Sequence, residues 1–429
     1  MPYTCAMSFR DRLRKAKRSI GPGFITGAAD DDPSGIATYS QTGAQFGYSQ
    51  TWLSLFSYPF MTAMQEMCGR IGMVTGTGLS AVIKKHYSKK ILYAAVFLLL
   101  FANTVNIGAD LGAMAAAVQL VAPLPFPFLI VAITAFTLLL EILMAYPTYA
   151  RILKYLTLSL LAYVITAILI KPDWQQVIKS TLIPHVEFTR EYVLNIAAFL
   201  GTTISPYLFF WQADEEVEEE VRLNKLTSMG EGVPVVSKEE ISQMKVDTAL
   251  GMFFSNFISL FIIVTVAGTL GLSGIHNIET AADAANALRP LAGEWAFLLF
   301  AIGIIGVGLL AVPILAGSSA YAIAETFDWK EGLSRRFREA HGFYGVITIA
   351  TLVGLLVNFI GIPSMTMLYY AAMINGVLAP PLMIIILLIG NNKSILGEHT
   401  NSKLSNTLGI IITAIMSVVA LSFLFVLLF

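Results

Sequence analysis

The sequence predicts an all-α polytopic membrane protein with about 11 transmembrane helices. Of its 429 residues, 56% are hydrophobic and only 13% are charged, whereas charged residues make up about a quarter of a globular sequence. The mean hydropathy is +0.71. Apolar runs recur from end to end, and each is long enough to cross a bilayer core of about 30 Å. The runs lie near residues 21–40, 48–72, 91–118, 126–146, 150–170, 193–214, 246–271, 292–325, 343–359, 365–389 and 407–428.

The distribution of Lys and Arg between the spans predicts the orientation in the membrane. Basic residues collect in "RDRLRKAKR" before the first span, "KKHYSKK" after the second, Arg151 and Lys154 after the fourth, and "WKEGLSRRFREAH" after the eighth. These segments fall on one side, and the segment "KPDWQQVIKSTLIPHVEFTREY" is the exception on the other. Because basic loops stay inside, we expect residues 1–20 to be a basic cytoplasmic N-terminus and the C-terminus to lie outside. Residues 1–20 lack the apolar stretch of a cleavable signal peptide.

Two spans carry residues that interrupt a helix. The first contains "AADDDPSG" and the sixth contains "FLGTTISPYLFF". Proline removes a backbone donor and clashes with the preceding turn, so both helices are expected to break, at Pro33 and at Pro206. Five spans separate the two breaks, which predicts inverted five-helix repeats at 21–170 and 193–390, with an eleventh helix at 407–428. Broken helices at matching positions indicate a transporter binding site near the bilayer midplane.

The first break carries three successive carboxylates, Asp30, Asp31 and Asp32. A charged residue at the membrane centre costs at least about 2.5 to 3.5 kcal/mol, so it faces a partner or a water-filled cavity. Successive helical residues point about 100° apart, so the three cannot line one pocket while the helix persists. If the chain unwinds at Asp32, freed carbonyls and the negative end of the half-helix join a carboxylate as hard oxygen ligands. This combination favours a small multivalent cation.

Four other acidic features have more than one interpretation. Glu66 lies four residues before Arg70, which favours a structural ion pair. Asp110 lies among small residues of the third span and either supports the cation site or serves packing. Glu141 has no evident partner. The segment from 214 to 245 begins with "DEEVEEEVRLNK" and is interpreted as a solvated helix; the alternative is a vestibule that attracts cations.

Several function classes are disfavoured by the sequence. It has no HExxH motif, no phosphate-binding glycine loop and no evident nucleophile with a base, so we do not expect an enzyme or a cofactor. Cys5 and Cys68 form neither a disulfide framework nor a CxxC site. The net charge of −1 and the distribution of charge on loops give no nucleic-acid surface.

Two stretches resemble a known family. "GPGF", "DPSG" and "ATYSQTGAQFGY" in the first span, and "GRIGMVTGTGLSAVI" at 69–83, resemble the Nramp family of divalent metal transporters. The resemblance implies the LeuT-type inverted 5+5 repeat of the amino acid, polyamine and organocation transporters, with discontinuous helices 1 and 6. It also implies that metal binds between these two helices.

Carried over residue by residue, the resemblance implies a metal site at Asp32, Ala29, Gly35, Thr202 and Ser205. Here Ala29 supplies a carbonyl, while Gly35 replaces the asparagine of the family and Ser205 its methionine. Without the thioether the site favours hard ions, so the chain most resembles the prokaryotic Nramp-related magnesium transporters, with Mg²⁺ as principal ion and Mn²⁺ also accepted.

Other positions are expected to contribute less directly. Asp30, Asp31, Tyr207 and Asp110 are interpreted as water-mediated or vestibule residues. The family's proton-handling histidine and glutamate correspond here to Tyr207 and Ala113, so uptake driven by the membrane potential is expected. The predicted protein is a monomer in a prokaryotic plasma (inner) membrane, and its partners are divalent ions and lipid.

Three alternatives remain open at this stage. The first is an ordinary proton-coupled Mn²⁺ or Fe²⁺ transporter. The second is an amino-acid transporter of the same fold, although the three aspartates would repel a substrate carboxylate. The third is that the acidic segment binds a partner protein.

Overall fold

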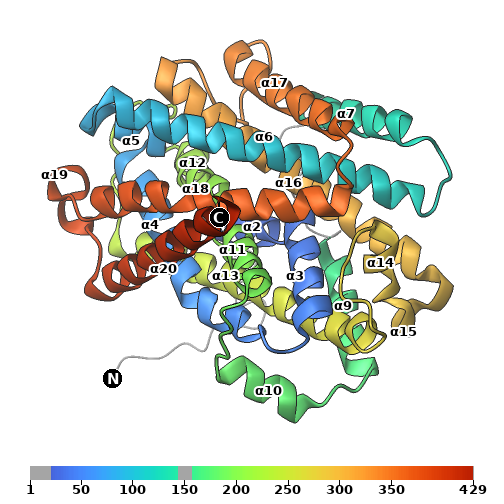
Figure 1. The fold of residues 1–429 in the computed structure, drawn as a ribbon. Coiled ribbons are helices and arrows are strands. Elements are labelled where there is room, and N and C mark those ends of the chain that lie inside the picture. The colour runs from blue at the N-terminus through green and yellow to red at the C-terminus, as the bar shows by residue number, and fades with distance from the viewer. Residues whose placement is uncertain (1–20, 144–156, 429) are drawn as a thin grey trace, which may run out of the picture.

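The computed structural model describes residues 21–143 and 157–428, and every regular element within them is helical (Figure 1). The helices are α2 (Pro22–Asp30), α3 (Pro33–Phe46), α4 (Trp52–Thr75), α5 (Leu79–His86), α6 (Lys89–Gln119), α7 (Phe126–Leu143), α9 (Leu161–Leu169), α10 (Trp174–Leu182), α11 (Arg190–Thr203), α12 (Pro206–Arg222), α13 (Lys238–Val266), α14 (Ala281–Asn286), α15 (Arg289–Ala292), α16 (Ala296–Phe327), α17 (His341–Val357), α18 (Ser364–Gly390), α19 (Lys393–Leu396) and α20 (Lys403–Leu428). The predicted all-α class is confirmed. The predictions for residues 1–20, Cys5, Arg151 and Lys154 lie outside the described residues.

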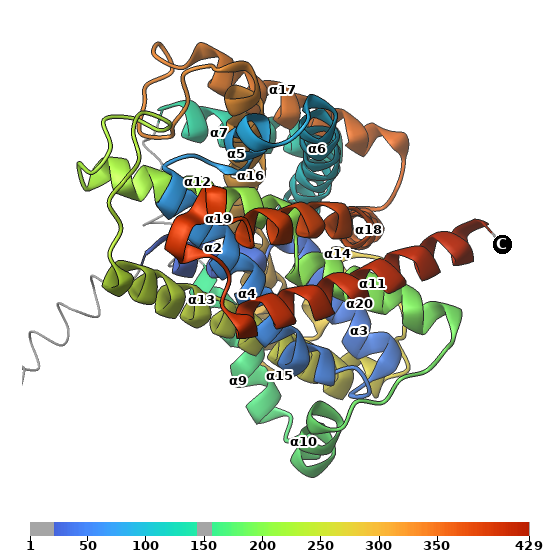
Figure 2. The ribbon, with the colours of Figure 1, turned by 90° about the vertical axis from the view of Figure 1, so that its left-hand side faces the viewer.

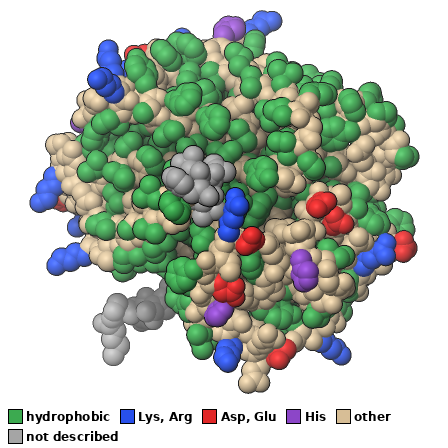
Figure 3. Space-filling model, in the orientation of Figure 1, with side chains coloured by type: hydrophobic (Ala, Val, Ile, Leu, Met, Phe, Trp, Pro, Cys, Tyr) green, Lys and Arg blue, Asp and Glu red, His purple; other side chains and the backbone are tan. Residues whose placement is uncertain are grey.

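The long helices have the length and composition of membrane spans. Within the described residues, 8 helices are long and apolar enough to cross a bilayer. The first span falls below this length because it is split into α2 and α3, which have 9 and 14 residues. Apolar side chains cover much of the surface, while charged ones gather mainly toward its left and lower right edges (Figure 3). The protein is therefore a multi-pass membrane protein.

The first predicted break is confirmed at Asp31 and Asp32. The helix α2 ends at Asp30, and α3 begins with Pro33 at its first position, where the missing N–H costs nothing. Asp32 is the N-cap of α3, and its side chain accepts a hydrogen bond from the Gly35 backbone N–H. A short polar residue before a proline is the local signal that starts the second half-helix.

The second predicted break is confirmed at Ile204 and Ser205. The helix α11 ends at Thr203, and α12 begins with Pro206 as its first residue and Ser205 as its N-cap. Each broken span therefore presents a helix C-terminus and a helix N-terminus at the same depth. In each span the helix C-terminus carries a partial negative charge and the helix N-terminus a partial positive one.

The half-helix α2 packs on α13 at van der Waals contact between backbones. A Cβ atom added to Gly27 would lie 2.2 Å from the carbonyl carbon of Gly251, and one added to Gly251 would lie 2.3 Å from the carbonyl oxygen of Gly23. Small residues permit this approach between membrane helices. Asp247 of α13 also accepts hydrogen bonds from the backbone N–H groups of Gly21 and Phe24, at 2.9 and 3.2 Å. These contacts hold α2 closed against α13.

The last helix, α20, lies on the outside of the bundle. It contacts α18, α11 and α4, and Figure 2 shows it running along their outer side. The helix α20 includes residues 407–428 and lies at the periphery of the bundle.

The prediction of a solvated acidic helix after the sixth span is wrong for half of its acids. The helix α12 continues to Arg222 between α4 and α16, so Asp214, Glu216 and Glu220 are buried. The sequence run of acids looked solvated because it follows an apolar span directly. Its burial results from the tertiary position of α12 inside the bundle.

Candidate functional site

Asp32 is the centre of a buried polar site in the first break. One oxygen, Oδ1, accepts hydrogen bonds from the Gly35 backbone N–H at 2.8 Å and from the Ser34 hydroxyl at 2.6 Å. The other, Oδ2, accepts from Asn106 Nδ2 of α6 at 2.8 Å. Only 1% of Asp32 is exposed. All three donors are neutral, so they orient the carboxylate without cancelling its charge.

The two helix breaks lie in direct contact. The Tyr207 hydroxyl of α12 donates to the Ala29 carbonyl oxygen of α2 at 3.1 Å. The hydroxyls of Ser34 and Thr202 are 3.4 Å apart. One carbonyl and three hydroxyls from the two broken spans therefore come together near the Asp32 carboxylate.

The space at Gly35 is filled in this conformation. A Cβ added there would lie 3.3 Å from the Asp30 carbonyl oxygen and from the Tyr39 ring, and 3.4 Å from Thr202 Oγ1. The space at Gly35 is thus closed in this conformation by Tyr39, Thr202 and the Asp30 backbone. The Ser205 hydroxyl donates to the carbonyl oxygens of Gly201 and Thr202, at 2.9 and 2.7 Å, which leaves its oxygen lone pairs as the available ligand.

Asp30 and Asp31 face a different helix from Asp32. Ser255 Oγ of α13 lies 2.6 Å from Asp30 Oδ2 and 3.2 Å from Asp31 Oδ1. Within the described part of the chain, Asp30 Oδ1 and Asp31 Oδ2 have no hydrogen-bond partner. Both residues are fully buried, so they do not line an open vestibule in this conformation.

Two residues of α6 complete the site from the third span. Asn106, which binds Asp32, lies one turn before Asp110, so both share a helix face. Asp110 is fully buried, and neither of its oxygens has a hydrogen-bond partner among the described residues. A role for Asp110 was predicted from the sequence, whereas the contact between Asn106 and Asp32 was not. The spacing "NIGAD", which places the amide and the acid four residues apart, was the available signal.

Negative charge is left uncompensated at this site. Among the described residues, no ion pair involves Asp30, Asp31, Asp32 or Asp110. Burial of unpaired carboxylates is costly unless they bind a proton or a cation. The arrangement can therefore hold a cation on hard oxygen ligands.

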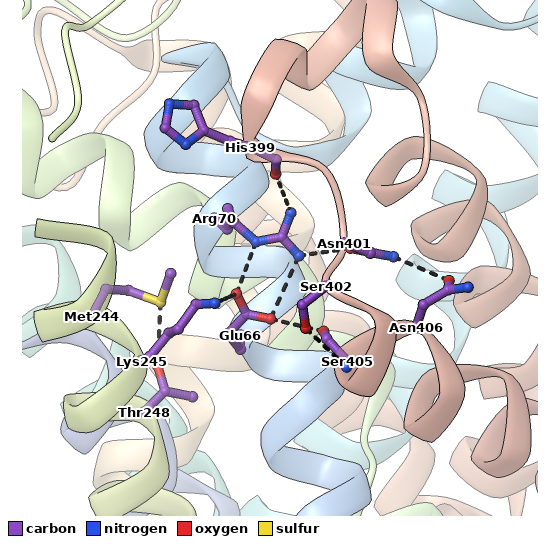
Figure 4. A network of polar contacts seen from close by, with 10 residues as sticks. All are labelled: Glu66, Arg70, Met244, Lys245, Thr248, His399, Asn401, Ser402, Ser405 and Asn406. Atoms are coloured by element: carbon purple, nitrogen blue, oxygen red, sulfur yellow. Dashed lines mark hydrogen bonds and ion pairs between the residues drawn. The ribbon is translucent and has the colours of Figure 1, made fainter. Parts of the chain in front are cut away.

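Glu66 and Arg70 form the ion pair that their spacing predicted. Arg70 Nε lies 2.8 Å from Glu66 Oε1, and Lys245 Nζ of α13 lies 3.2 Å from the same oxygen. Arg70 also donates to the His399 carbonyl oxygen and to Asn401 Oδ1 before α20 (Figure 4). This network joins α4 to α13 and to the chain before α20, so its role is structural. Both oxygens of Glu141, in contrast, have no hydrogen-bond partner within the described residues.

A cavity of about 300 Å³ opens beyond the second half of the first broken span. It is lined by Ala37 and Gln41 of α3, Glu191 of α11 and Glu279 of the loop before α14, among others. Ala37 lies one turn after Pro33, so this cavity lies along the half-helix that begins next to Asp32.

Comparison with known proteins identifies the family. Residues 23–426 match the family described as Nramp, natural resistance-associated macrophage protein-like. The divalent metal cation transporter MntH of Yersinia pestis (strain Pestoides F) is 25% identical over 434 residues, covering 95% of this chain and 94% of that protein. The MntH of Pectobacterium carotovorum is 26% identical over 310 residues, covering 71% of this chain and 72% of that one.

Solved structures show the same fold. The Eremococcus coleocola manganese transporter, solved with an aromatic bis-isothiourea substituted compound, has a TM-score of 0.75 at 15% identity and covers 97% of this chain and 88% of its own. The inward-facing structure of Mhp1 has a TM-score of 0.53 at 14% identity, with 94% and 91% covered. These similarities confirm the LeuT-type architecture with discontinuous first and sixth helices. The chain belongs to the Nramp family.

Proposed function

We propose that this protein carries divalent metal cations across the membrane by alternating access, with Mg²⁺ as the principal ion and Mn²⁺ as a second substrate. The observation that carries the proposal is the Asp32 carboxylate, which is buried between two broken helices and has only neutral hydrogen-bond donors. Similar proteins are named divalent metal cation or manganese transporters, which supports this class of substrate.

The proposed setting is a prokaryotic plasma membrane, with a monomeric protein whose N-terminus is cytoplasmic. The basic residues Lys84 and Lys85 of α5 belong to the side predicted to be inside. The repeats at 21–170 and 193–390, with an eleventh helix at 407–428, are part of the same proposal. The cavity beside Ala37 then opens to the outside.

The preference for Mg²⁺ rests on the chemistry of the ligands. The groups next to Asp32 are the Ala29 carbonyl and the hydroxyls of Ser34 and Thr202. Soft thioether ligands favour transition metals, whereas Mg²⁺ prefers oxygen and retains several waters. Because the space at Gly35 is closed in this conformation, a partly hydrated ion must enter when the two broken spans move apart.

The proposed driving force is the membrane potential. A divalent cation gains about 4.6 kcal/mol per 100 mV, inside negative, so no coupling ion is required. Tyr207 stands at the position of the family's histidine and donates a hydrogen bond to the Ala29 carbonyl oxygen. A tyrosine hydroxyl does not titrate near neutral pH. A second candidate is proton-coupled Mn²⁺ or Fe²⁺ transport, and the unpartnered Asp110 favours it as the carrier of the proton.

Transport without protons has a direct test. In liposomes that contain a pH-sensitive dye, Mn²⁺ uptake is expected to leave the lumen pH unchanged, because neither a tyrosine hydroxyl at 207 nor the methyl group of Ala113 titrates near neutral pH. Valinomycin and a potassium gradient set the membrane potential, and a protonophore added at the end reports the dye's range. Acidification that requires both Mn²⁺ and Asp32 would establish the proton-coupled alternative, and Asp110→Asn would then abolish it.

Selectivity is expected to depend on Gly35 and Ser205. The double variant Gly35→Asn with Ser205→Met adds an amide and a thioether, so Mn²⁺ should gain affinity relative to Mg²⁺. We expect excess Mg²⁺ to inhibit Mn²⁺ uptake strongly in the parent and at least about tenfold less in the double variant, a difference of about 1.4 kcal/mol.

The Asn side chain of the Gly35→Asn change must fit into limited space. An added Cβ lies 3.3 Å from two neighbours, so Tyr39 must shift by a few tenths of an ångström. Gly345→Asn on α17 is the matched control, because its added Cβ meets no atom within 4 Å. Equal inhibition by Mg²⁺ in the parent and in an active double variant would contradict the role of these two positions.

A further inference from the structure

A second acidic site lies at the opposite end of α12 from the helix break. Asp214 is completely buried, and neither of its carboxylate oxygens has a hydrogen-bond partner within the described residues. Burial of an unpaired carboxylate is expensive, so the position requires a bound cation or proton. The family resemblance assigned no role to this residue.

The Asp214 carboxylate points toward Glu325 of α16. A Cβ added to Gly78, at the start of α5, would lie 1.8 Å from Asp214 Oδ1 and 2.6 Å from Glu325 Oε1, so these two oxygens are near neighbours. Glu325 is held in place because its two oxygens accept the backbone N–H groups of Gly78 at 2.6 Å and Ala81 at 3.0 Å. Two carboxylates, one of them held by backbone N–H groups, thus meet beside α5, which lies next to α12 and α16 (Figure 2).

A third acid lies near these two carboxylates. Glu331, in the loop after α16, has a buried oxygen without a partner among the described residues. Its burial, together with the charges of Glu325 and Glu218, raises the pKa of Glu331 to about 10. The nearby Lys84 Nζ forms an ion pair with Asp328 at 2.7 Å and donates to the backbone oxygen of Glu325 at 3.3 Å. In the described part of the chain, no basic side chain forms an ion pair with Asp214.

The position of Asp214 connects it to the first site. It follows Tyr207 by seven residues, so both lie on one face of α12, about 10 Å apart along the axis. Trp211 lies between them on the same face and is fully buried, with its ring centroid 6.4 Å from that of Tyr321. Asp214 and Glu325 therefore lie behind an aromatic barrier as seen from Asp32.

We propose that Asp214 and Glu325 form a second divalent-cation site, which receives a hydrated Mg²⁺ or Mn²⁺ on the cytoplasmic side of Trp211 after the ion leaves Asp32. The direction of movement rests on the proposed function, whereas binding itself does not. Two carboxylates with the remaining positions filled by water are a common way to hold Mg²⁺. Among the described residues, no group of three or more His, Cys, Asp or Glu side chains suited to a metal is found, so the proposed site rests on these two carboxylates and on water.

The test counts bound Mn²⁺ on the purified full-length protein by electron paramagnetic resonance, because free aqueous Mn²⁺ gives a distinct signal. The parent is expected to bind about two equivalents, and Asp32→Asn, Asp214→Asn and their combination about one, one and none. Asp214→Asn is the cleaner change at this site because its side chain has no hydrogen bond to lose, whereas Glu325 also caps α5. Glu239→Gln, an exposed acid on α13, is the matched control and should bind like the parent.

The outcomes separate the two proposals. If Asp214→Asn binds as much Mn²⁺ as the parent and elutes as folded protein, the second site does not exist. An Asp32→Asn variant without bound Mn²⁺ would also overturn it, and would show that Asp214 holds a proton instead. If Asp32→Asn binds as much as the parent and Asp214→Asn loses one equivalent, the second site stands and the proposed role of Asp32 fails.

Discussion

Replacement of Asp32 by Asn is expected to abolish uptake of both Mg²⁺ and Mn²⁺ while the protein stays folded and monodisperse. The change keeps the shape of the side chain but removes the negative charge that neutral donors hold between the two broken spans. Removing one partner of a buried charge pair costs about 3 to 5 kcal/mol, which corresponds to a loss of affinity of about 100-fold or more. Uptake into liposomes, measured with fluorescent indicators for each ion, checks this expectation.

Two variants define the specificity of the effect. Asp31→Asn should reduce uptake less than Asp32→Asn, because Asp31 faces Ser255 and not the second helix break. Glu239→Gln removes an exposed carboxylate and should transport like the parent. Undiminished uptake in Asp32→Asn would refute the site, and equal loss in both aspartate variants would mean that the two carboxylates share the ion.

Gly27→Val is expected to prevent α2 from closing on α13 and to reduce uptake by at least about tenfold. A Cβ at this position would lie 2.2 Å from the Gly251 carbonyl carbon, a backbone atom that cannot rotate away. Overpacking of this kind costs about 1 to 3 kcal/mol, and here the cost is avoided if α2 moves. The variant should therefore favour a state in which α2 stands away from α13.

Thiol labelling reports this state directly. In a background with Cys5 and Cys68 replaced by Ser, a cysteine introduced as Thr248→Cys lies beneath Gly23 and should resist a membrane-impermeant maleimide. The same cysteine should react when Gly27→Val is added. Gly345→Val is the matched control, because its Cβ would meet no atom within 4 Å. A Gly27→Val protein with normal uptake and an unreactive cysteine would show that this packing is not required for transport.

The sequence predicted the features that local chemistry determines. Proline and a short polar residue end and restart helices, so the breaks at Pro33 and Pro206 could be placed correctly. The pair Glu66 and Arg70 was also predictable, because four residues correspond to one helical turn. These inferences needed no knowledge of how the helices pack.

Features that depend on packing between helices were missed. Asn106 could not be assigned to Asp32 without the rotation of α6 about its axis. The burial of Asp214 depends on α4 and α16 enclosing α12, and the orientation of Asp30 and Asp31 depends on Ser255 of a helix more than 220 residues away. The closed space at Gly35 could not be predicted either, because it depends on where Tyr39 and Thr202 lie.

The position of a bound ion tests the central claim most directly. Crystals of the parent protein soaked in Mn²⁺ should give an anomalous scattering peak at bonding distance from an Asp32 carboxylate oxygen, between the break of α2 and α3 and the break of α11 and α12. The peak should weaken when Mg²⁺ is added in excess and should be absent in Asp32→Asn. A parent protein that transports Mn²⁺ but shows its ion only elsewhere, with no peak beside Asp32, would contradict the account.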